Sequence, residues 1–460
     1  MFVASEFDAE LIARYDRSGP RYTSYPTAAQ FHVGFDAHAY RAAALLSNRT
    51  DAPLSIYVHV PFCASPCFYC GCNRVITRNP LHAQRYVEAL CREIELQARL
   101  FHTHRRIEQL HFGGGTPTFL STEQLGRIMS CLRREFVLAD DEQREYSIEI
   151  DPRTVDTAVI DGLAALGFNR MSLGIQDFDP TVQTAVNRVQ SVAQTREIVG
   201  HARALGIDQI NFDLIYGLPH QSQESFAATL AQVIELRPSR IAAYGYAHLP
   251  HMFKAQRQID SRALPNAAQR LALLELTVRQ LTDAGYEYIG MDHFALPDDL
   301  LTRALRDGSL HRNFQGYSSR ADCDLIGLGV SAIGKVGDAY AQNARELKDY
   351  YASIEHDQLA IRKGYKLTSD DRIRRDVIQQ IMCAGEIDFH AIADDHCIDF
   401  AAYFEHELLA LEDMRRDGLI EDTPSGIRVT PKGRFLVRTI AMVFDAHLQA
   451  AQRPAFSKVI

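Results

Sequence analysis

Residues Leu54–Cys72 have the sequence LSIYVHVPFCASPCFYCGC. The first seven residues form a short β-branched and aromatic run, which predicts a strand. Cys63, Cys67 and Cys70 follow with Cys-x3-Cys-x2-Cys spacing, and Cys72 comes two residues later. The stretch therefore predicts a strand whose carboxyl end leads into a loop of clustered thiols.

The cysteine cluster indicates metal or redox chemistry, because in a reducing compartment such spacing seldom serves disulfides. A structural zinc site takes four ligands, commonly from two separated pairs, whereas an iron–sulfur cluster can take thiolates from one loop. Three thiolates would leave one iron of a [4Fe–4S] cluster open to the amine and carboxylate of an amino acid. Since Cys72 offers a fourth ligand, the spacing favours the cluster but leaves zinc, or thiols without metal, as alternatives.

After residue 53, strand-like runs alternate with stretches of helical spacing such as Arg85–Leu100, Glu123–Phe136 and Ala193–Leu205. Regular alternation predicts an α/β fold with a parallel sheet and right-handed crossovers. Six units suit an incomplete (β/α)6 barrel, with a flavodoxin-like or Rossmann sheet as the alternative. The predicted strands are Leu54–Val60, Ile107–Phe112, Tyr146–Ile150, Met171–Ile175, Ile210–Ile215 and Ile241–Tyr246.

Polar residues recur at the carboxyl ends of successive predicted strands. Glu149 lies on the minority face of its strand, Gln176 follows its strand directly, and Asp213 lies opposite apolar neighbours. Barrels of this kind build their sites at these strand ends. We therefore expect the three side chains to converge on one site.

Two further segments differ from the alternating region. Residues 18–28, SGPRYTSYPTA, predict an extended and ordered arm, with a lid or a substrate-contacting role as the sharper hypothesis. After about residue 365, an amphipathic helix and then a helix–hairpin–helix pattern resemble a winged-helix module, although Asp417, Glu421 and Asp422 make its wing acidic. We expect a mainly helical domain that covers the barrel. The predicted divisions are an arm at 1–50, a barrel with its extension at 51–364 and a helical domain at 365–460.

Charge and hydropathy limit the classes of partner. A formal net charge of −9 argues against wholesale nucleic-acid binding. The sequence has no apolar run near the roughly 18 residues of a membrane span, and its first residues, MFVASEFDAE, lack a charged-then-apolar leader. We therefore expect a cytoplasmic protein without a nucleic-acid or membrane partner.

The cysteine spacing, with Tyr69 before the last cysteine, resembles the signature of the radical SAM superfamily. The motifs YVHVPFC, HFGGGTPTFL, SIEIDPR, LGIQDF, NFDLIYGLP, HRNFQGY and GVSAIG also stand in order along nearly the whole chain. Together with PRYTSYP near the N-terminus, they resemble the oxygen-independent coproporphyrinogen III oxidases.

The resemblance implies a [4Fe–4S] cluster on Cys63, Cys67 and Cys70, with Cys72 outside the ligand set. It also implies two molecules of S-adenosylmethionine, one of them on the open iron. The positions that match the family's contacts to these molecules are Tyr57, Tyr69, Gly114, Gly115, Thr116, Glu149, Gln176, Arg188, Asp213, Ala247 and Ile333.

The implied reaction is oxidative decarboxylation of two propionates of coproporphyrinogen III to vinyl groups, which yields protoporphyrinogen IX for heme synthesis. It needs no protein nucleophile or acid–base residue, and it uses a 5′-deoxyadenosyl radical from reductive cleavage of S-adenosylmethionine. We expect a flavodoxin-type electron donor and a monomer.

Because the substrate has four carboxylates, Arg21 and Arg312 are hypothesised to contact its propionates. Two alternatives stay open at this point. The first is a related heme chaperone of the same superfamily, and the second is a zinc-stabilised winged-helix regulator.

Overall fold

The computed structural model describes residues 7–141, 144–320 and 323–450. The chain folds into two compact units. Of the described residues, those within 31–266 and 323–366 form the barrel unit, and those within 7–30, 267–320 and 367–450 form the helical unit. Both units are discontinuous in sequence, and the predicted divisions at residues 50 and 364 stay predictions.

The barrel unit contains the six predicted strands, paired in parallel in the order in which they occur along the chain. A doubly wound sheet reverses its strand order at a switch point, and these six strands do not. The prediction of an incomplete barrel is thus confirmed and the Rossmann alternative is wrong. The strands are β1 (Leu54–Val60), β4 (Arg106–Gly114), β6 (Glu145–Ile150), β7 (Arg170–Gln176), β8 (Gln209–Tyr216) and β9 (Arg240–Gly245).

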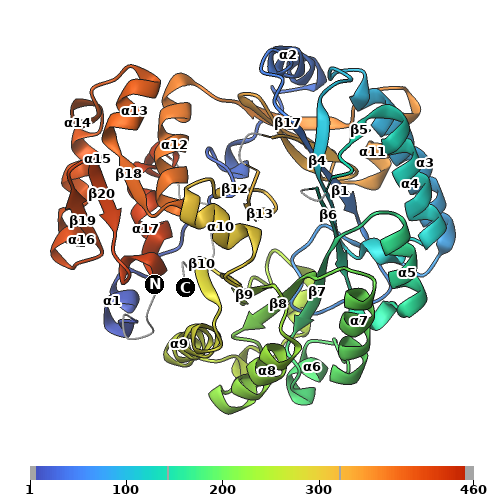
Figure 1. The fold of residues 1–460 in the computed structure, drawn as a ribbon, viewed down its shortest axis with the longest axis horizontal. Coiled ribbons are helices and arrows are strands. Elements are labelled where there is room, and N and C mark those ends of the chain that lie inside the picture. The colour runs from blue at the N-terminus through green and yellow to red at the C-terminus, as the bar shows by residue number, and fades with distance from the viewer. Residues whose placement is uncertain (1–6, 142–143, 321–322, 451–460) are drawn as a thin grey trace. The chain divides into compact units, whose positions relative to one another are not determined.

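Helices cover the outer side of this sheet, where Figure 1 shows α3, α4 and α5. The helix predicted from Arg85 begins earlier, at Pro80, because the Asn79 side chain accepts a hydrogen bond from Leu81 N and proline suits a first helical position. The helices are α2 (Ala37–Ser47), α3 (Pro80–Ala98), α4 (Thr122–Glu135), α5 (Thr157–Ala165), α6 (Pro180–Ala185), α7 (Val192–Ala204), α8 (Gln223–Leu236) and α11 (Leu347–Glu355).

The sheet continues beyond β1 into an extension that comes late in the chain. Strand β14 pairs with β1 in parallel, and β15, β16 and β17 follow in antiparallel order. The extension therefore occupies the free edge of β1, and the barrel stays open. Its strands are β14 (Asp324–Leu328), β15 (Ile333–Val336), β16 (Ala339–Asn343) and β17 (Ile361–Lys366), and short strands β2 (Phe62–Cys63), β3 (Val75–Ile76) and β5 (Val137–Leu138) complete the unit.

The helical unit has its own apolar core, which includes Tyr15 as well as Tyr22 and Tyr25 of the arm at residues 18–28. Residues 19–27 run without helix or strand, as expected for an extended arm. The Tyr22 hydroxyl donates to Asp445 at 2.9 Å, and Arg438 Nε donates to Pro20 O at 3.0 Å. The arm is therefore an integral part of this unit's core.

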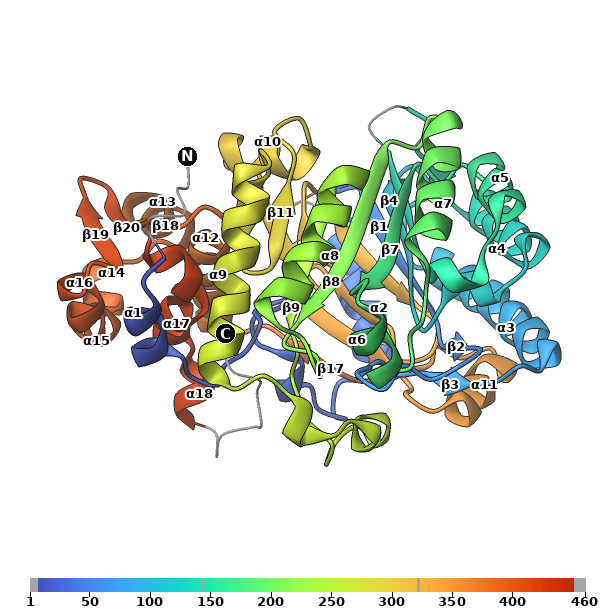
Figure 2. The same ribbon diagram turned by 90° about the horizontal axis from the view of Figure 1, so that it is seen from below.

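The predicted amphipathic helix and hairpin are both present in the helical unit, and Figure 2 shows them near one another. Thr368 and Asp371 form a capping box at the start of α12. Strands β18, β20 and β19 form a small antiparallel sheet, as in a winged helix. The elements are α1 (Ala9–Tyr15), α9 (Ala267–Asp283), β10 (Glu287–Gly290), β11 (His293–Ala295), α10 (Leu300–Asp307), β12 (His311–Asn313), β13 (Gly316–Ser318), α12 (Ser369–Cys383), β18 (Glu386–Asp388), α13 (Phe389–His396), α14 (Phe400–Tyr403), α15 (Glu405–Ala410), α16 (Glu412–Arg416), β19 (Ile420–Thr423), β20 (Gly426–Val429), α17 (Val437–Ala441) and α18 (Ala446–Ala450).

Two helices of the first fifty residues, α1 and α2, were not predicted, because their sequences show little periodicity.

Among the described residues, none of the helices combines the length and the apolar character needed to cross a membrane.

A buried carboxylate on α3 ties the extension to the barrel. Glu93 is fully buried and accepts hydrogen bonds from Gly329 N at 2.6 Å, Asn343 Nδ2 at 2.6 Å and the Tyr350 hydroxyl at 2.8 Å. Burial raises the pKa of Glu93 to about 7. The three partners belong to the loop after β14, to β16 and to α11, so one side chain fixes three segments.

Replacement of Glu93 by alanine should destabilise the barrel unit, because it removes the acceptor of three buried hydrogen bonds, and of the three donors Asn343 Nδ2 alone retains another one, Gly329 O. We expect a loss of roughly 2–4 kcal/mol in the free energy of unfolding, since each such group costs about 1–3 kcal/mol and partial relaxation recovers some of it. Urea denaturation measures this loss. Glu88→Ala, an exposed position on the same helix, is the control and should change stability by less than about 0.5 kcal/mol. Equal stability of the two variants would contradict this role for Glu93.

Candidate active site

The cysteine loop is fastened to the end of β4 by main-chain hydrogen bonds. Gly115 N donates to Val60 O and Thr116 N donates to Phe62 O, both at 2.8 Å. A Cβ on Gly115 would lie 2.8 Å from the main-chain atoms of Pro61 and Phe62, so a side chain cannot be accommodated there. Glycine is therefore needed for two main chains to meet, and not only for the approach of a ligand.

Cys63, Cys67 and Cys70 are partly buried free thiols that line one cavity of the barrel unit. The Thr116 hydroxyl donates to Cys63 Sγ at 3.5 Å, and Cys72 N donates to Cys70 Sγ at 3.4 Å. Burial raises the pKa of the Cys63 thiol to about 11, whereas the hydrogen bond from the Cys72 thiol lowers the pKa of Cys70 to about 6. Arg74 donates to the main-chain oxygens of Cys70 and Cys67 at 3.1 and 3.3 Å and holds the loop in its turn.

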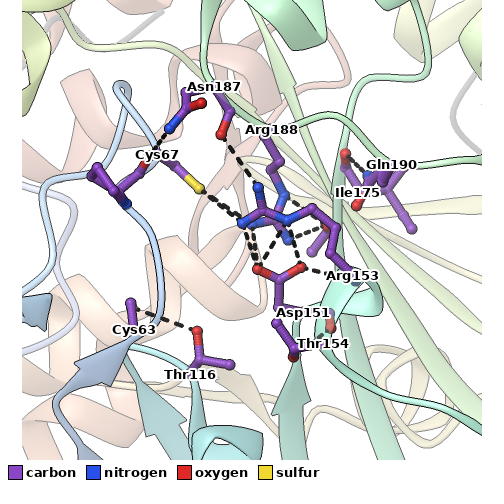
Figure 3. A network of polar contacts seen from close by, with 12 residues as sticks. Cys63, Cys67, Thr116, Asp151, Arg153, Thr154, Ile175, Asn187, Arg188 and Gln190 are labelled. Atoms are coloured by element: carbon purple, nitrogen blue, oxygen red, sulfur yellow. Dashed lines mark hydrogen bonds and ion pairs between the residues drawn. The ribbon is translucent and has the colours of Figure 1, made fainter. Parts of the chain in front are cut away.

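Two arginines and one carboxylate surround Cys67, as Figure 3 shows. Arg188 Nη1 lies 3.4 Å and Arg153 Nη2 lies 3.5 Å from Cys67 Sγ. Asp151 accepts from Arg153 at 2.6 Å and from Arg188 at 3.1 Å. Burial alone would raise the pKa of Asp151, but these two guanidinium groups hold it below its usual value.

Carboxylates occupy another part of the cavity lining. Glu149 accepts a hydrogen bond from Gly114 N at 3.1 Å and lies 3.2 Å from His111 Nε2. Asp213 accepts from the Ser172 hydroxyl at 2.8 Å and from Asn211 Nδ2 at 3.0 Å. Burial, followed by the charge of Glu149, raises the pKa of Asp213 to about 6.

The structure brings most of the sequence-predicted residues to this cavity, and the convergence expected of Glu149, Gln176 and Asp213 is confirmed. Three others, all within the described residues, are not among its lining: Tyr57, Ala247 and Ile333. The lining contains Cys63, Cys67, Tyr69, Cys70, Gly114, Gly115, Thr116, Glu149, Gln176, Arg188 and Asp213, together with the unpredicted Arg74, Asp151, Arg153 and Ser172.

Ala247 is held near the cysteine loop by a residue that the sequence did not reveal. Gln256, only 2% exposed, donates from Nε2 to Tyr69 O at 2.9 Å and to Ala247 O at 3.2 Å. Its Oε1 accepts from Leu249 N at 2.5 Å. A lone glutamine in the short 3-10 helix Lys254–Gln258 carries no motif, so its role becomes visible only in three dimensions.

Tyr57 and Ile333 are both neighbours of Gly327 in β14. Tyr57 is paired in register with Gly327, and a Cβ on Gly327 would lie 2.8 Å from the main chain of Ile333. The Tyr57 ring also stacks on His111 with 5.8 Å between centroids. Through His111, Tyr57 is therefore connected to Glu149 in the cavity wall.

Comparison with known proteins identifies the family of this chain. Residues 57–233 match the model of the radical SAM superfamily, and residues 367–436 match that of the HemN C-terminal domain. The chain is 52% identical to the oxygen-independent coproporphyrinogen III oxidase of Pseudomonas aeruginosa over 99% of both chains, and 48% identical to that of Escherichia coli with the same coverage. It belongs to the oxygen-independent coproporphyrinogen III oxidases.

The solved structure of coproporphyrinogen III oxidase (HemN) from Escherichia coli, described as a radical SAM enzyme, matches the fold with a TM-score of 0.91. It is 47% identical and the match covers 96% of this chain and 99% of that one. The alternative of a zinc-stabilised winged-helix regulator is thereby overturned.

Radical SAM enzymes bind a [4Fe–4S] cluster and S-adenosylmethionine, and the residues of this oxidase fit both groups. Three thiols from one loop share a cavity with cations near the sulfurs, which suits thiolate ligands. The same cavity offers Glu149 and Asp213 as acceptors for ammonium or ribose hydroxyl groups, and Arg188 as a partner for a carboxylate.

The arginines hypothesised to contact substrate belong to the helical unit of this oxidase. Arg21 is paired with Asp292, and its side chain is 36% exposed. Arg312 is only 2% exposed; its Nε donates to Arg21 O at 3.2 Å and its guanidinium lies over the Tyr317 ring. Arg312 Nη1 has no hydrogen-bond partner among the described residues.

The raised pKa of Asp213 makes a prediction about stability. The folded chain holds this proton up to about pH 6, whereas an unfolded aspartate releases it near pH 4. The free energy of unfolding should therefore fall as the pH rises from about 4 to 6, by about 2 kcal/mol on account of this group. Asp213→Asn should remove this part of the decline in the free energy of unfolding. Urea denaturation of the metal-free chain at a series of pH values measures it.

Asp208→Asn, an exposed position just before the same strand, is the matched control and should keep the native pH profile. An unchanged slope in Asp213→Asn would contradict the assignment.

Proposed function

We propose that this chain converts two propionate side chains of coproporphyrinogen III to vinyl groups by oxidative decarboxylation, which gives protoporphyrinogen IX for heme synthesis. The observation that carries the proposal is the cavity in which three loop thiols meet strand-end carboxylates and Arg188, in a chain that matches the Pseudomonas aeruginosa oxidase over 99% of its length. The reaction does not require oxygen, since the family is oxygen-independent by name.

Cys63, Cys67 and Cys70 would hold the cluster, and the cavity wall would hold S-adenosylmethionine. When bound, these groups supply one-electron reductive chemistry that starts the removal of a hydrogen atom from the propionate. The chain's own residues would bind these groups and orient them. Glu149 and Asp213 accept hydrogen bonds from ammonium or hydroxyl groups, and Arg188 opposes a carboxylate.

The remaining proposed contacts to S-adenosylmethionine are Tyr57, Tyr69, Gly114, Gly115, Thr116, Gln176, Ala247 and Ile333. Tyr69 has its main-chain oxygen fixed by Gln256, which supports a defined orientation of the loop. A protein acid, base or nucleophile is not part of this proposal, because the chemistry requires only precise placement and exclusion of water.

The proposal also includes a low-potential, flavodoxin-type electron donor, a monomeric state and a cytoplasmic location. A one-electron donor is required because the starting step consumes an electron. The location agrees with the thiol cluster, which needs a reducing compartment.

Loss of a cluster thiol tests the proposal. Cys67→Ala should lose the visible iron–sulfur absorption, and formation of 5′-deoxyadenosine should drop by at least about 100-fold, a loss of roughly 3 kcal/mol of stabilisation. Anaerobically reconstituted protein, S-adenosylmethionine and coproporphyrinogen III make up the assay. Cys72→Ala, in the same loop, should retain iron content and product. A native chain that forms no 5′-deoxyadenosine would overturn the proposed function, and loss of the cluster in Cys72→Ala would overturn the count of three thiolates.

Arg21→Ala should raise the KM for coproporphyrinogen III about tenfold, because a charged hydrogen bond to a carboxylate contributes about 1.5–3 kcal/mol. Steady-state anaerobic kinetics measure this change. Arg14→Ala, at an arginine of the same N-terminal segment that pairs with Asp417, is the control and should leave KM unchanged. Native KM and turnover in Arg21→Ala would refute a substrate role for this arm residue.

A further inference from the structure

The three cysteines of the loop do not receive the same kind of hydrogen bond. Cys63 Sγ accepts from the neutral hydroxyl of Thr116, and Cys70 Sγ accepts from the main-chain amide and the neutral thiol of Cys72. Cys67 Sγ lies within 3.5 Å of two guanidinium groups, those of Arg153 and Arg188. Among the described residues, guanidinium groups thus donate directly to the sulfur of Cys67 and not to those of Cys63 or Cys70.

The sequence motif and the backbone explain how Arg153 reaches this sulfur. It lies in the 3-10 turn Pro152–Thr154, directly after β6, and Asp151 caps that turn by accepting from Arg153 N at 3.1 Å. Asp151 Oδ2 also accepts from Arg153 Nη2 at 2.6 Å. The turn and the ion pair together fold the guanidinium back toward Cys67, as Figure 3 shows.

A second link fixes the same part of the loop. Arg153 Nη1 donates to Asn187 O at 3.2 Å, and Asn187 Nδ2 donates to Pro66 O at 2.7 Å. Pro66 directly precedes Cys67. Hydrogen bonds therefore fix both the Arg153 guanidinium and the main chain next to Cys67, so the fold itself places the two groups close together.

The local charge balance is positive. Two guanidinium groups share one carboxylate, and the exposed fractions of Arg153, Arg188 and Asp151 are only 18%, 7% and 9%. Solvent and salt screen such charges weakly. Since Arg188 is the proposed partner of a bound carboxylate, Arg153 is the cation left for the sulfur.

We propose that Arg153 raises the reduction potential of the [4Fe–4S] cluster by donating a charged hydrogen bond to Cys67. This inference rests on the proposed function, since it requires the cluster on Cys63, Cys67 and Cys70. The step concerned is the uptake of one electron from a low-potential donor, which takes the cluster from the 2+ to the 1+ state without breaking a bond. The added negative charge is shared with the thiolate sulfurs, so a nearby cation stabilises the reduced state.

The proposed effect eases electron delivery. Hydrogen bonds and burial are the means by which a protein tunes iron–sulfur potentials. A higher potential lets the donor reduce the cluster more completely, at the cost of a smaller driving force for the cleavage that follows. Arg153 acts through Cys67 and is in that sense a positioning and tuning residue.

The test is a redox titration of the anaerobically reconstituted enzyme without S-adenosylmethionine or substrate, with dithionite as reductant, mediators and the electron paramagnetic resonance signal of the reduced cluster. Arg153→Met removes the charge and the donor. Its one-electron reduction should become about tenfold less favourable, which is a midpoint shift of about 59 mV to more negative potential. Arg153→Lys keeps the charge without the planar fork, and it should shift the potential in the same direction by a smaller amount.

Arg196→Gln is the matched control. This arginine also belongs to the barrel unit and pairs with Glu235 at 2.9 Å, but both side chains are more than half exposed. The Arg196→Gln substitution removes one positive charge, as Arg153→Met does, and should leave the midpoint potential of the cluster unchanged. Iron and sulfide content confirm that each variant carries the cluster.

The outcomes separate the inference from the proposed function. If the native chain assembles no cluster, the proposed function fails. If clusters assemble and Arg153→Met titrates at the native potential, or at a more positive one, the inference is overturned. Should Arg153→Met not retain a cluster, Arg153→Lys decides: a native potential there overturns the inference, and a negative shift supports it.

Discussion

Strand β4 can end against β1 and the start of the cysteine loop only because Gly114 and Gly115 have no side chains. A Cβ on Gly115 would overlap the main chain of Pro61 and Phe62, and a Cβ on Gly114, whose φ is +115°, would lie 2.6 Å from the His59 ring. The resulting hydrogen bonds from Gly115 and Thr116 carry the Thr116 hydroxyl to Cys63. The loop geometry thus depends on contact between two main chains, and the remaining site residues are arranged around that contact.

Given this anchor, the cavity has a region with two cations and a separate region with two carboxylates. The turn after β6 and the segment after α6 bring cations to Cys67, while β6 and β8 bring Glu149 and Asp213 to another part of the wall. A cationic region suits thiolates and electron uptake, and a carboxylate region suits a ligand with ammonium and hydroxyl groups. Burial and the charge of Glu149 raise the pKa of Asp213, so the ionised form of Asp213 is destabilised in the folded chain without a ligand. Such perturbed carboxylates are common at binding sites.

The parts of this design that follow local periodicity could be predicted from the sequence. All six predicted barrel strands agree with the structure to within two residues at either end, and alternation along them placed Glu149 and Asp213 on the cavity side. The residues that bridge separate segments could not be predicted. Gln256 contacts Tyr69, and Arg153 contacts Cys67 and Asn187, all distant in sequence, and such contacts leave no periodic pattern in the sequence.

The two arginines hypothesised to contact the substrate show a second limit of prediction from the sequence. Four carboxylates in the substrate require cations, but they do not say which of the arginines lie in a structural network. Arg312 is almost fully buried and its Nε is already used by the main chain of Arg21. Arg21, with 36% of its side chain exposed, can exchange Asp292 for a ligand carboxylate at lower cost than Arg312 can leave its burial. Of the two, Arg21 is therefore the better placed to meet a propionate, and Arg312 is better placed to position Arg21.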